Sequence, residues 1–156
     1  KRQPKKQSRG DIMRLIVEVQ MRPTEDQEKI MKALTNLFDL DDIKVEDGGK
    51  YKKIVGVSEK VSSLKKFREK IWMQRILDTA RSMMLRGASE ESIIFMLHKQ
   101  AAYAGKVSFI ENESESSLGP IVVKIETKAP REIIDWLAPK TSEGKPLWIK
   151  DMPAEA

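Results

Sequence analysis

The chain has 156 residues, 40% of them hydrophobic and 34% charged, and a formal net charge of +5 at pH 7. This length suits a single domain that buries about 70% of the surface its unfolded chain would expose. With no cysteine and one histidine, His98, the chain excludes thiol chemistry and disulfides, and we expect neither a metal nor a cofactor.

The two ends differ in composition from the middle. Residues 1–12 begin with a basic stretch that holds five lysines and arginines and no acidic residue within its first ten positions. Such a polar stretch buries too little apolar surface to offset its ordering entropy, so we expect a flexible leader. A single domain is expected over residues 13–139. Residues 140–156 are expected to form a loosely attached tail, from which Leu147, Trp148 and Ile149 could dock.

The first predicted elements are a strand, a helix and a hairpin. Apolar and polar side chains alternate from Met13 to Met21, the period of a half-buried strand. Thr24 and Gln27 have the spacing of a capping box, which predicts a helix from there to Phe38. Two short strands, near residues 43–46 and 50–57, are predicted to pair around a turn that contains two glycines.

A single long helix is predicted next. Ser62 or Ser63 would cap it, an apolar stripe runs from Leu64 to Met84, and Gly87 would end it. One face of this helix carries cationic, aromatic and hydroxyl side chains at spacings of three or four: Arg68, Trp72, Arg75, Thr79, Ser82 and Arg86. That face could meet RNA, a partner subunit or water.

A second helix is predicted from Ser89 to Gly105, where a glycine is well placed to terminate it. A strand over residues 106–110, an exposed acidic loop over 111–117, a strand over 121–126 and a helix from Pro130 to Leu137 follow. The predicted order is βαββααββα. It indicates an α+β fold of two layers, with a largely antiparallel sheet and helices packed on one face.

Charge is unevenly distributed along the chain. Residues 1–10 alone carry a charge equal to the net charge of +5, so the remainder is balanced. Within that remainder, residues 11–49 carry −5 and residues 50–86 carry +8. A basic patch could face phosphates, or acidic and basic surfaces could meet within the fold or across a dimer.

No set of residues indicates an enzyme. His98 lies in a polar segment with no nucleophile and carboxylate placed around it. The acidic cluster at Asp39, Asp41 and Asp42 lacks the glycine and the glutamate of a calcium loop. No apolar run approaches the ~20 residues of a membrane span. We therefore expect a non-catalytic cytoplasmic protein without membrane contact.

Five motifs follow one another along the chain: Arg22-Pro23-Thr24-Glu25-Asp26, Phe67-Arg68-Glu69-Lys70, Gln74-Arg75-Ile76-Leu77-Asp78-Thr79-Ala80-Arg81, Lys99-Gln100-Ala101-Ala102-Tyr103-Ala104-Gly105-Lys106-Val107-Ser108-Phe109 and Leu118-Gly119-Pro120-Ile121. In this order they resemble an archaeal family of uncharacterised proteins, uncharacterised protein family two hundred and one. The match covers roughly residues 13–139. The resemblance implies a fold similar to the ribosomal protein that binds 5S rRNA, and it brings no catalytic residues with it.

RNA binding, or a role associated with RNA, is the leading functional hypothesis. A homodimeric protein-interaction module without RNA binding is the alternative. In the RNA version, lysines and arginines meet phosphates and a tryptophan stacks on an unpaired base. The candidate contacts are Lys65, Arg68, Trp72, Arg75, Lys99 and Lys106.

Overall fold

The computed structural model describes residues 13–154, and the predicted leader lies outside that range. Its main sheet has six antiparallel strands in the order β2-β3-β1-β6-β4-β5. These are β1 (Arg14–Met21), β2 (Asp42–Asp47), β3 (Lys52–Ser58), β4 (Ser92–His98), β5 (Phe109–Ile110) and β6 (Pro120–Glu126). A separate small hairpin joins β7 (Thr141–Ser142) to β8 (Lys145–Pro146).

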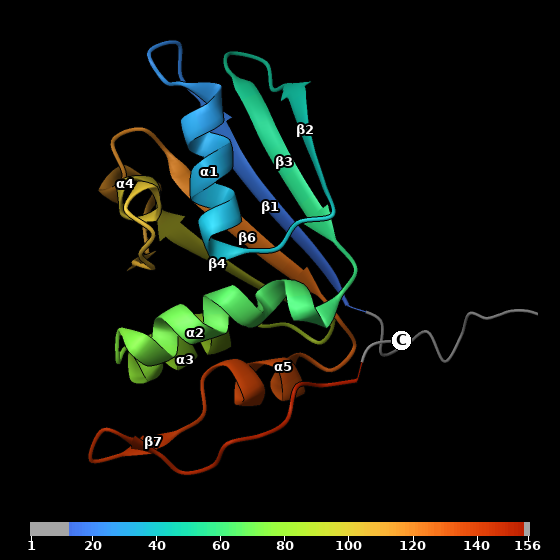
Figure 1. Ribbon diagram of the computed structural model, residues 1–156, viewed down its shortest axis with the longest axis vertical. Helices are drawn as coiled ribbons and strands as arrows, with labels where there is room; N and C mark the ends of the chain where they lie inside the picture. Colours follow the sequence, from blue (N-terminus) through green and yellow to red (C-terminus); the bar gives the residue numbers. More distant parts are fainter. Residues whose placement is uncertain (1–12, 155–156) are drawn as a thin grey trace, which may run out of the picture.

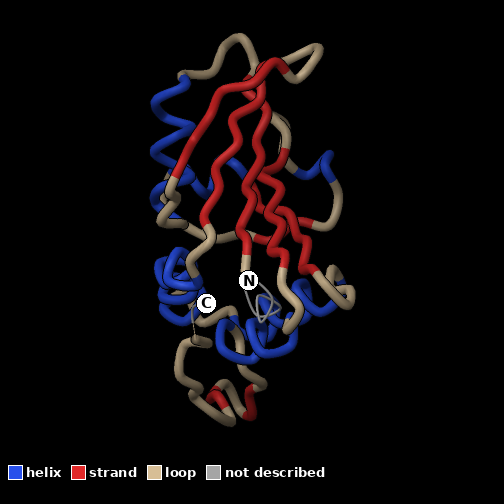
Figure 2. Tube along the Cα trace, turned by 90° about the vertical axis from the view of Figure 1, so that its right-hand side faces the viewer, coloured by secondary structure: helices blue, strands red, loops and turns tan. Residues whose placement is uncertain are grey.

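The helices cover one face and one end of this sheet (Figures 1 and 2). They are α1 (Gln27–Leu37), α2 (Lys65–Met73), α3 (Leu77–Arg86), α4 (Lys99–Tyr103) and α5 (Pro130–Leu137). In Figure 1, α1 and α4 lie in front of the strands, whereas α2, α3 and α5 gather below them. The predicted α+β class, with an antiparallel sheet and helices on one side, is confirmed.

Alternation in the central strands explains why one sheet face is covered and the other is not. Leu15, Val17 and Val19 of β1 are buried, whereas the residues between them are more exposed. Val17 lies opposite Val123 of β6. A core of apolar side chains forms on that face, and stacked rings join it to the helices: Phe38, Phe67 and Phe95 follow one another at centroid distances of 5.3 and 5.5 Å.

The predicted long helix is two helices. The chain breaks between α2 and α3 because Arg75 adopts a left-handed conformation with φ of 59°. No glycine or proline marks this break in the sequence. The predicted serine cap is also wrong, because residues 61–64 form a 3-10 turn and Leu64 precedes α2 without a side-chain cap.

The predicted helix from Ser89 to Gly105 is mostly a strand. Residues 92–98 form β4, which pairs with β6, and only the short α4 that follows is helical. The predicted strand over residues 106–110 is reduced to β5. The helix α1 is capped by Asp26, whose carboxylate accepts the backbone N–H of Glu28, and not by Thr24.

The C-terminal segment contacts the domain at several points: Lys150 lies 3.6 Å from Asp135, and Met152 packs against the core. The indole N–H of Trp148 donates to the carbonyl oxygen of Asp135 at 3.0 Å. The neighbouring Leu147 and Ile149 are 58% and 73% exposed, so of the three residues expected to dock only the tryptophan does.

Candidate functional site

The six predicted RNA contacts fall into three structural settings. Lys65, Arg75 and Lys106 are exposed. Arg68 and Trp72 are half-buried against α5, and Lys99 is completely buried. The structure therefore does not bring all six to one surface.

Arg75 and Lys106 lie where the end of α2 meets the segment after α4. Gln74 joins the two: its Nε2 donates to the carbonyl oxygen of Val107 at 2.8 Å, and its Oε1 accepts the Val107 N–H at 2.9 Å. Arg75 directly follows Gln74 in the sequence, and Lys106 directly precedes Val107. This double hydrogen bond therefore brings the backbones of the two cationic residues near each other. Lys70 also reaches this place, since a Cβ built on Gly105 would lie 3.6 Å from its Nζ.

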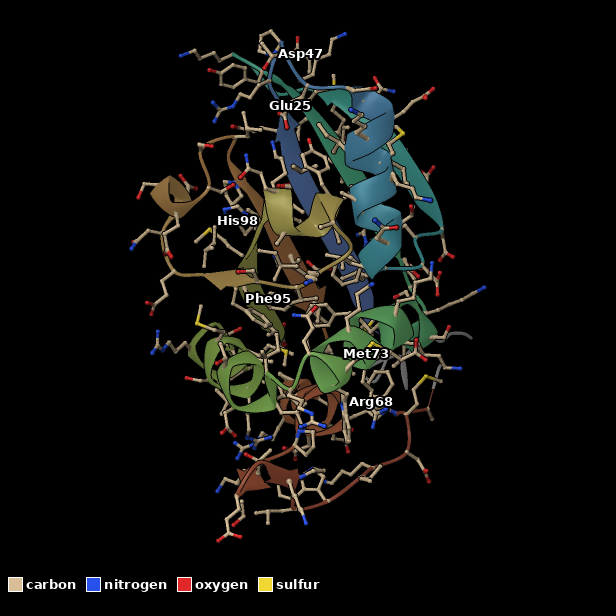
Figure 3. The ribbon with its side chains drawn as sticks, turned by 60° about the vertical axis from the view of Figure 1, so that its left-hand side comes forward. Glu25, Asp47, Arg68, Met73, Phe95 and His98 are labelled. Atoms are coloured by element: carbon tan, nitrogen blue, oxygen red, sulfur yellow. The ribbon has the colours of Figure 1, made fainter. Side chains whose placement is uncertain are left out.

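Lys70, Arg75 and Lys106 form what we call the basic ridge, and the exposed Lys65 lies at the other end of α2. The most exposed apolar side chain of the ridge is Met73, at 82% exposure, immediately before the break in the helix (Figure 3). The left-handed turn at Arg75 ends α2 abruptly and leaves Met73 uncovered. The ridge is thus a fixed projection with positive charge and one exposed thioether.

Arg68 and Trp72 serve the fold. Arg68 Nε donates to the carbonyl oxygen of Trp136 at 2.8 Å, and its guanidinium lies 4.4 Å from the ring of Trp72. Trp72 Nε1 donates to the carbonyl oxygen of Leu137 at 2.9 Å. Burial lowers the pKa of Arg68 from its usual value, while the charge of Glu69 acts in the opposite direction. An arginine held in this way has little freedom to meet a phosphate.

Side-chain N–H groups donate to all four backbone carbonyl oxygens at the C-terminal end of α5. A helix leaves its last four carbonyl oxygens without partners inside the helix. Here Trp148, Arg68, Trp72 and Arg81 donate in turn to residues 135–138. Cationic donors are also favoured there by the helix dipole. We refer to these four donors as the α5 cap.

Arg81 is the buried member of the α5 cap. It is 6% exposed, and its Nη1 also contacts Asp135 Oδ1 at 2.9 Å. Asp135 is further approached by Lys150 at 3.6 Å and by Arg131 at 3.7 Å. No sequence motif indicates this role, because Arg81 is separated from Asp135 by more than fifty residues.

Lys99 lies in a buried polar cluster between α4 and the start of α1. Its Nζ donates to the carbonyl oxygens of Gln20 and Leu118, and contacts both carboxylate oxygens of Glu25 at 3.0 and 3.1 Å. The side chains of Lys99 and Glu25 are 0% and 4% exposed. All three donors of the ammonium group are engaged, so we remove Lys99 from the proposed RNA surface.

Two further groups tie Glu25 in place. The Tyr103 hydroxyl donates to Glu25 Oε2 at 2.8 Å, and the Arg22 backbone N–H donates to Glu25 Oε1 at 2.8 Å. Burial acts to raise the pKa of Glu25, but hydrogen bonds from Arg22, Lys99 and Tyr103 outweigh it and leave the pKa lowered. Burial lowers the pKa of Lys99, and Arg22 adds to that shift while Glu25 opposes it. Burial and then Glu25 raise the pKa of Tyr103.

The one histidine of the chain, His98, has a structural role. His98 ends β4 and precedes α4, and its Nδ1 accepts the backbone N–H of Ala101 at 3.3 Å. Across residues 13–154, no group of three or more acidic or histidine side chains is placed to hold a metal ion. Within the same residues, no helix has the length and apolar character to cross a bilayer.

The structure defines an antiparallel α+β domain that presents a basic ridge, and comparison with known proteins places it in a class described as RNA binding. A family model described as RNA binding matches residues 14–128. The chain belongs to the archaeal UPF0201 family, which confirms the resemblance drawn from the five motifs.

Relatives in this family span nearly the whole chain. A UPF0201 protein of Sulfurisphaera tokodaii is 46% identical over 144 residues, which is 92% of this chain and 99% of the relative. A UPF0201 protein of Metallosphaera sedula is 44% identical over 144 residues, which is 92% of this chain and 100% of the relative. The crystal structure of a UPF0201 protein from Methanococcus jannaschii is similar with a TM-score of 0.72 at 32% identity, covering 86% of this chain and 98% of that one.

Proposed function

We propose that this chain is a non-catalytic protein that binds RNA through the basic ridge. The observation that carries the proposal is the double hydrogen bond from Gln74 to Val107, which holds two basic segments together. Backbone segments held together before binding lose less conformational entropy when the cations they carry meet phosphates. The match to the RNA-binding family model supports the same class of ligand.

The ridge differs from the surface expected from the sequence. Arg68 Nε and Trp72 Nε1 both donate to carbonyl oxygens of α5, so both side chains are held against that helix and we leave them out of the ridge. Met73 takes the position of the exposed apolar side chain. An exposed methionine beside cations can wedge against a base step, as apolar side chains do in other nucleic-acid complexes.

Replacing Arg75 and Lys106 together with glutamate should abolish most RNA binding. The full chain is used with its five leader cations replaced by glutamine, so that the leader cannot mask the result. Each lost phosphate contact on single-stranded RNA should reduce the slope of log K against log salt by about 0.7. Filter binding at several salt concentrations measures this, and stability should change by no more than ~0.5 kcal/mol, since both side chains are exposed.

A matched control uses two exposed lysines of the β2–β3 hairpin, Lys44 and Lys52, both changed to glutamate. This variant has the same net charge and should retain most binding. Gln74→Ala separates geometry from charge, because it removes the two hydrogen bonds and no cation. Wild-type RNA affinity in the Arg75 and Lys106 double variant would contradict the proposal.

Self-association stays a prediction. The helix face that suggested it, with Arg68 and Trp72, is occupied by α5 within the same chain. The sheet face that no helix within residues 13–154 covers is another surface through which two copies could associate. It carries Ile94, which is 44% exposed, among other partly exposed apolar side chains.

A further inference from the structure

We propose that the hollow beside Arg22 binds the phosphate group of a ribose phosphate, supplied either by a free ribonucleotide or by a phosphorylated RNA end. The hollow is lined by a different set of residues from the basic ridge, and this inference does not rest on RNA binding there.

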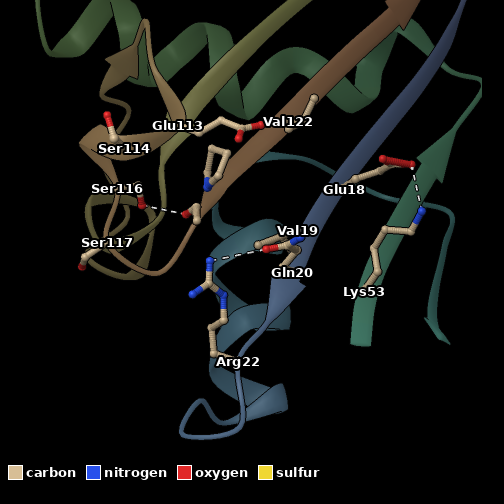
Figure 4. A pocket seen from close by; sticks show the side chains of 12 residues that line it. Glu18, Val19, Gln20, Arg22, Lys53, Glu113, Ser114, Ser116, Ser117 and Val122 are labelled. Carbon is tan, nitrogen blue, oxygen red and sulfur yellow. Dashed lines mark hydrogen bonds and ion pairs between the residues drawn. The ribbon is translucent and has the colours of Figure 1, made fainter. Parts of the chain in front are cut away.

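The hollow lies against the sheet near the ends of β1 and β6 (Figure 4). The segment from Glu113 to Gly119 forms one wall, and Lys53 of β3 lies on the other side. Its volume is about 460 Å³, within the range of sites that take small molecules. A ribose phosphate or a mononucleotide can be accommodated in a volume of this order.

Arg22 is the group that selects an oxyanion. Its guanidinium lies 4.4 Å from the ring centre of Tyr51. Its Nη2 makes one long hydrogen bond, 3.5 Å to Gln20 Oε1, and among the described residues its buried Nε has no partner. Guanidinium donors that are partly buried and incompletely paired are costly, and a phosphate supplies the acceptors they lack.

The wall opposite the guanidinium is shaped to leave it room. Gly119 has φ of +89°, and a Cβ at this position would lie 3.4 Å from Arg22 Nη2. The adjoining Ser116 hydroxyl is occupied, since it donates to the carbonyl oxygen of Gly119 at 2.6 Å. Ser114 and Ser117 also line the hollow and are exposed. Their hydroxyls can donate to phosphate oxygens.

The charge next to the hollow favours an anion. Arg22 lies close enough to Lys99 to depress the pKa of that lysine, although burial is the larger cause. The hollow is lined by two cations, Arg22 and Lys53, and by two carboxylates, Glu18 and Glu113. Lys53 and Glu18 pair with each other, whereas Arg22 forms no ion pair within the described residues. An anion beside Arg22 supplies that counter-charge.

The far side of the hollow presents carboxylates, and these can bind the hydroxyl groups of a ligand. Glu18 is paired with Lys53 at 3.6 Å. Glu113 is exposed, and its carboxylate extends toward Val122 in Figure 4. A carboxylate accepts hydrogen bonds from ribose hydroxyls. Arg22 and Glu113 together therefore match the two ends of a ribose phosphate.

Isothermal titration calorimetry of the full chain with ribose 5-phosphate tests the proposal. We expect saturable binding, weaker binding of inorganic phosphate, and none of ribose. Arg22→Gln should weaken ribose 5-phosphate binding at least about tenfold, since it removes a charge-assisted contact. Arg14→Gln, the same change at the other end of β1 and outside the hollow, should leave it unchanged.

A second variant keeps the test decisive if Arg22→Gln disturbs the fold. Glu113→Gln, on an exposed loop, should weaken ribose 5-phosphate binding while leaving inorganic phosphate binding as it is.

Short oligoribonucleotides with and without a 5′-phosphate distinguish the two sources: a preference for the phosphorylated end supports an RNA end, and binding of ribose 5-phosphate alone supports a free nucleotide. Absence of saturable binding by every phosphate probe, or full affinity in a folded Arg22→Gln variant, would overturn the proposal. Neither result would bear on the basic ridge, whose variants keep the hollow intact.

Discussion

Replacing Lys99 with alanine should lower the free energy of unfolding by about 3–5 kcal/mol, the usual effect of removing one member of a buried ion pair. Glu25, only 4% exposed, would keep its charge without a counterion. Two backbone carbonyls, those of Gln20 and Leu118, would also lose their donor. Urea denaturation followed by circular dichroism measures the change.

Two variants show whether the loss comes from the ion pair. Lys32→Ala, an exposed lysine of α1, should alter stability by no more than ~0.5 kcal/mol. Lys99→Met combined with Glu25→Gln should recover part of the loss, because no buried charge then remains and the amide oxygen still accepts from Tyr103. A Lys99→Ala protein as stable as wild type would show that Glu25 is solvated or neutral in the fold.

Acid should destabilise the protein partly through Glu25. Its pKa in the fold lies below the usual value of 4.5, because its hydrogen bonds outweigh burial. A carboxyl whose folded pKa is lowered contributes stability above its unfolded pKa and loses it as pH falls through the folded value. The Glu25→Gln variant should therefore have a lower stability at neutral pH and a shallower loss below pH ~4.5. Parallel pH slopes in the two proteins would argue against this role.

Arg81→Ala should cost about 1.5–3 kcal/mol, the range for hydrogen bonds that involve a charged group. Arg81 is buried and serves both Asp135 and the carbonyl oxygen of Ala138. Thermal unfolding should show a lower Tm. The natural control is Arg131→Ala, because Arg131 approaches the same Asp135 oxygen at 3.7 Å from an exposed position.

Exposed ion pairs contribute little, so Arg131→Ala should change stability by less than ~1 kcal/mol. Both arginines contact the same carboxylate, but Arg81 is buried and also donates to the carbonyl oxygen of Ala138, whereas Arg131 is exposed. Equal effects of the two substitutions would mean that the α5 cap does not depend on Arg81.

The strands predicted best from the sequence are those with one buried face and one more exposed face. In β1 and β6 every second residue faces the core, and this period of two is visible without a structure. The strand β4 is different. Its residues Ile93, Ile94 and Leu97 also fit a helical spacing, and a short apolar run is ambiguous by periodicity alone. Pairing with β6, nearly thirty residues later, decides the outcome.

The site was harder to predict because partners distant in sequence decide which cations are free. Lys99 looks like any surface lysine until Glu25, 74 residues earlier, is placed beside it. Arg68 and Arg75 are both arginines of the predicted helix face, yet only Arg68 meets the end of α5. The break at Arg75 has no proline or glycine to announce it, so the basic ridge could not be predicted as a unit.

The order of strands also limits how this protein can meet another chain. The outermost strands of the main sheet are β2 and β5. β5 has only two residues, and β2 carries Asp42, Lys44, Glu46 and Asp47 along its length. Short or charged outer strands resist the addition of a further strand by backbone hydrogen bonding, which is a common route to aggregation. Uncontrolled growth of the sheet into fibres is therefore disfavoured, and any specific assembly must use side-chain contacts on a face or at the helical end.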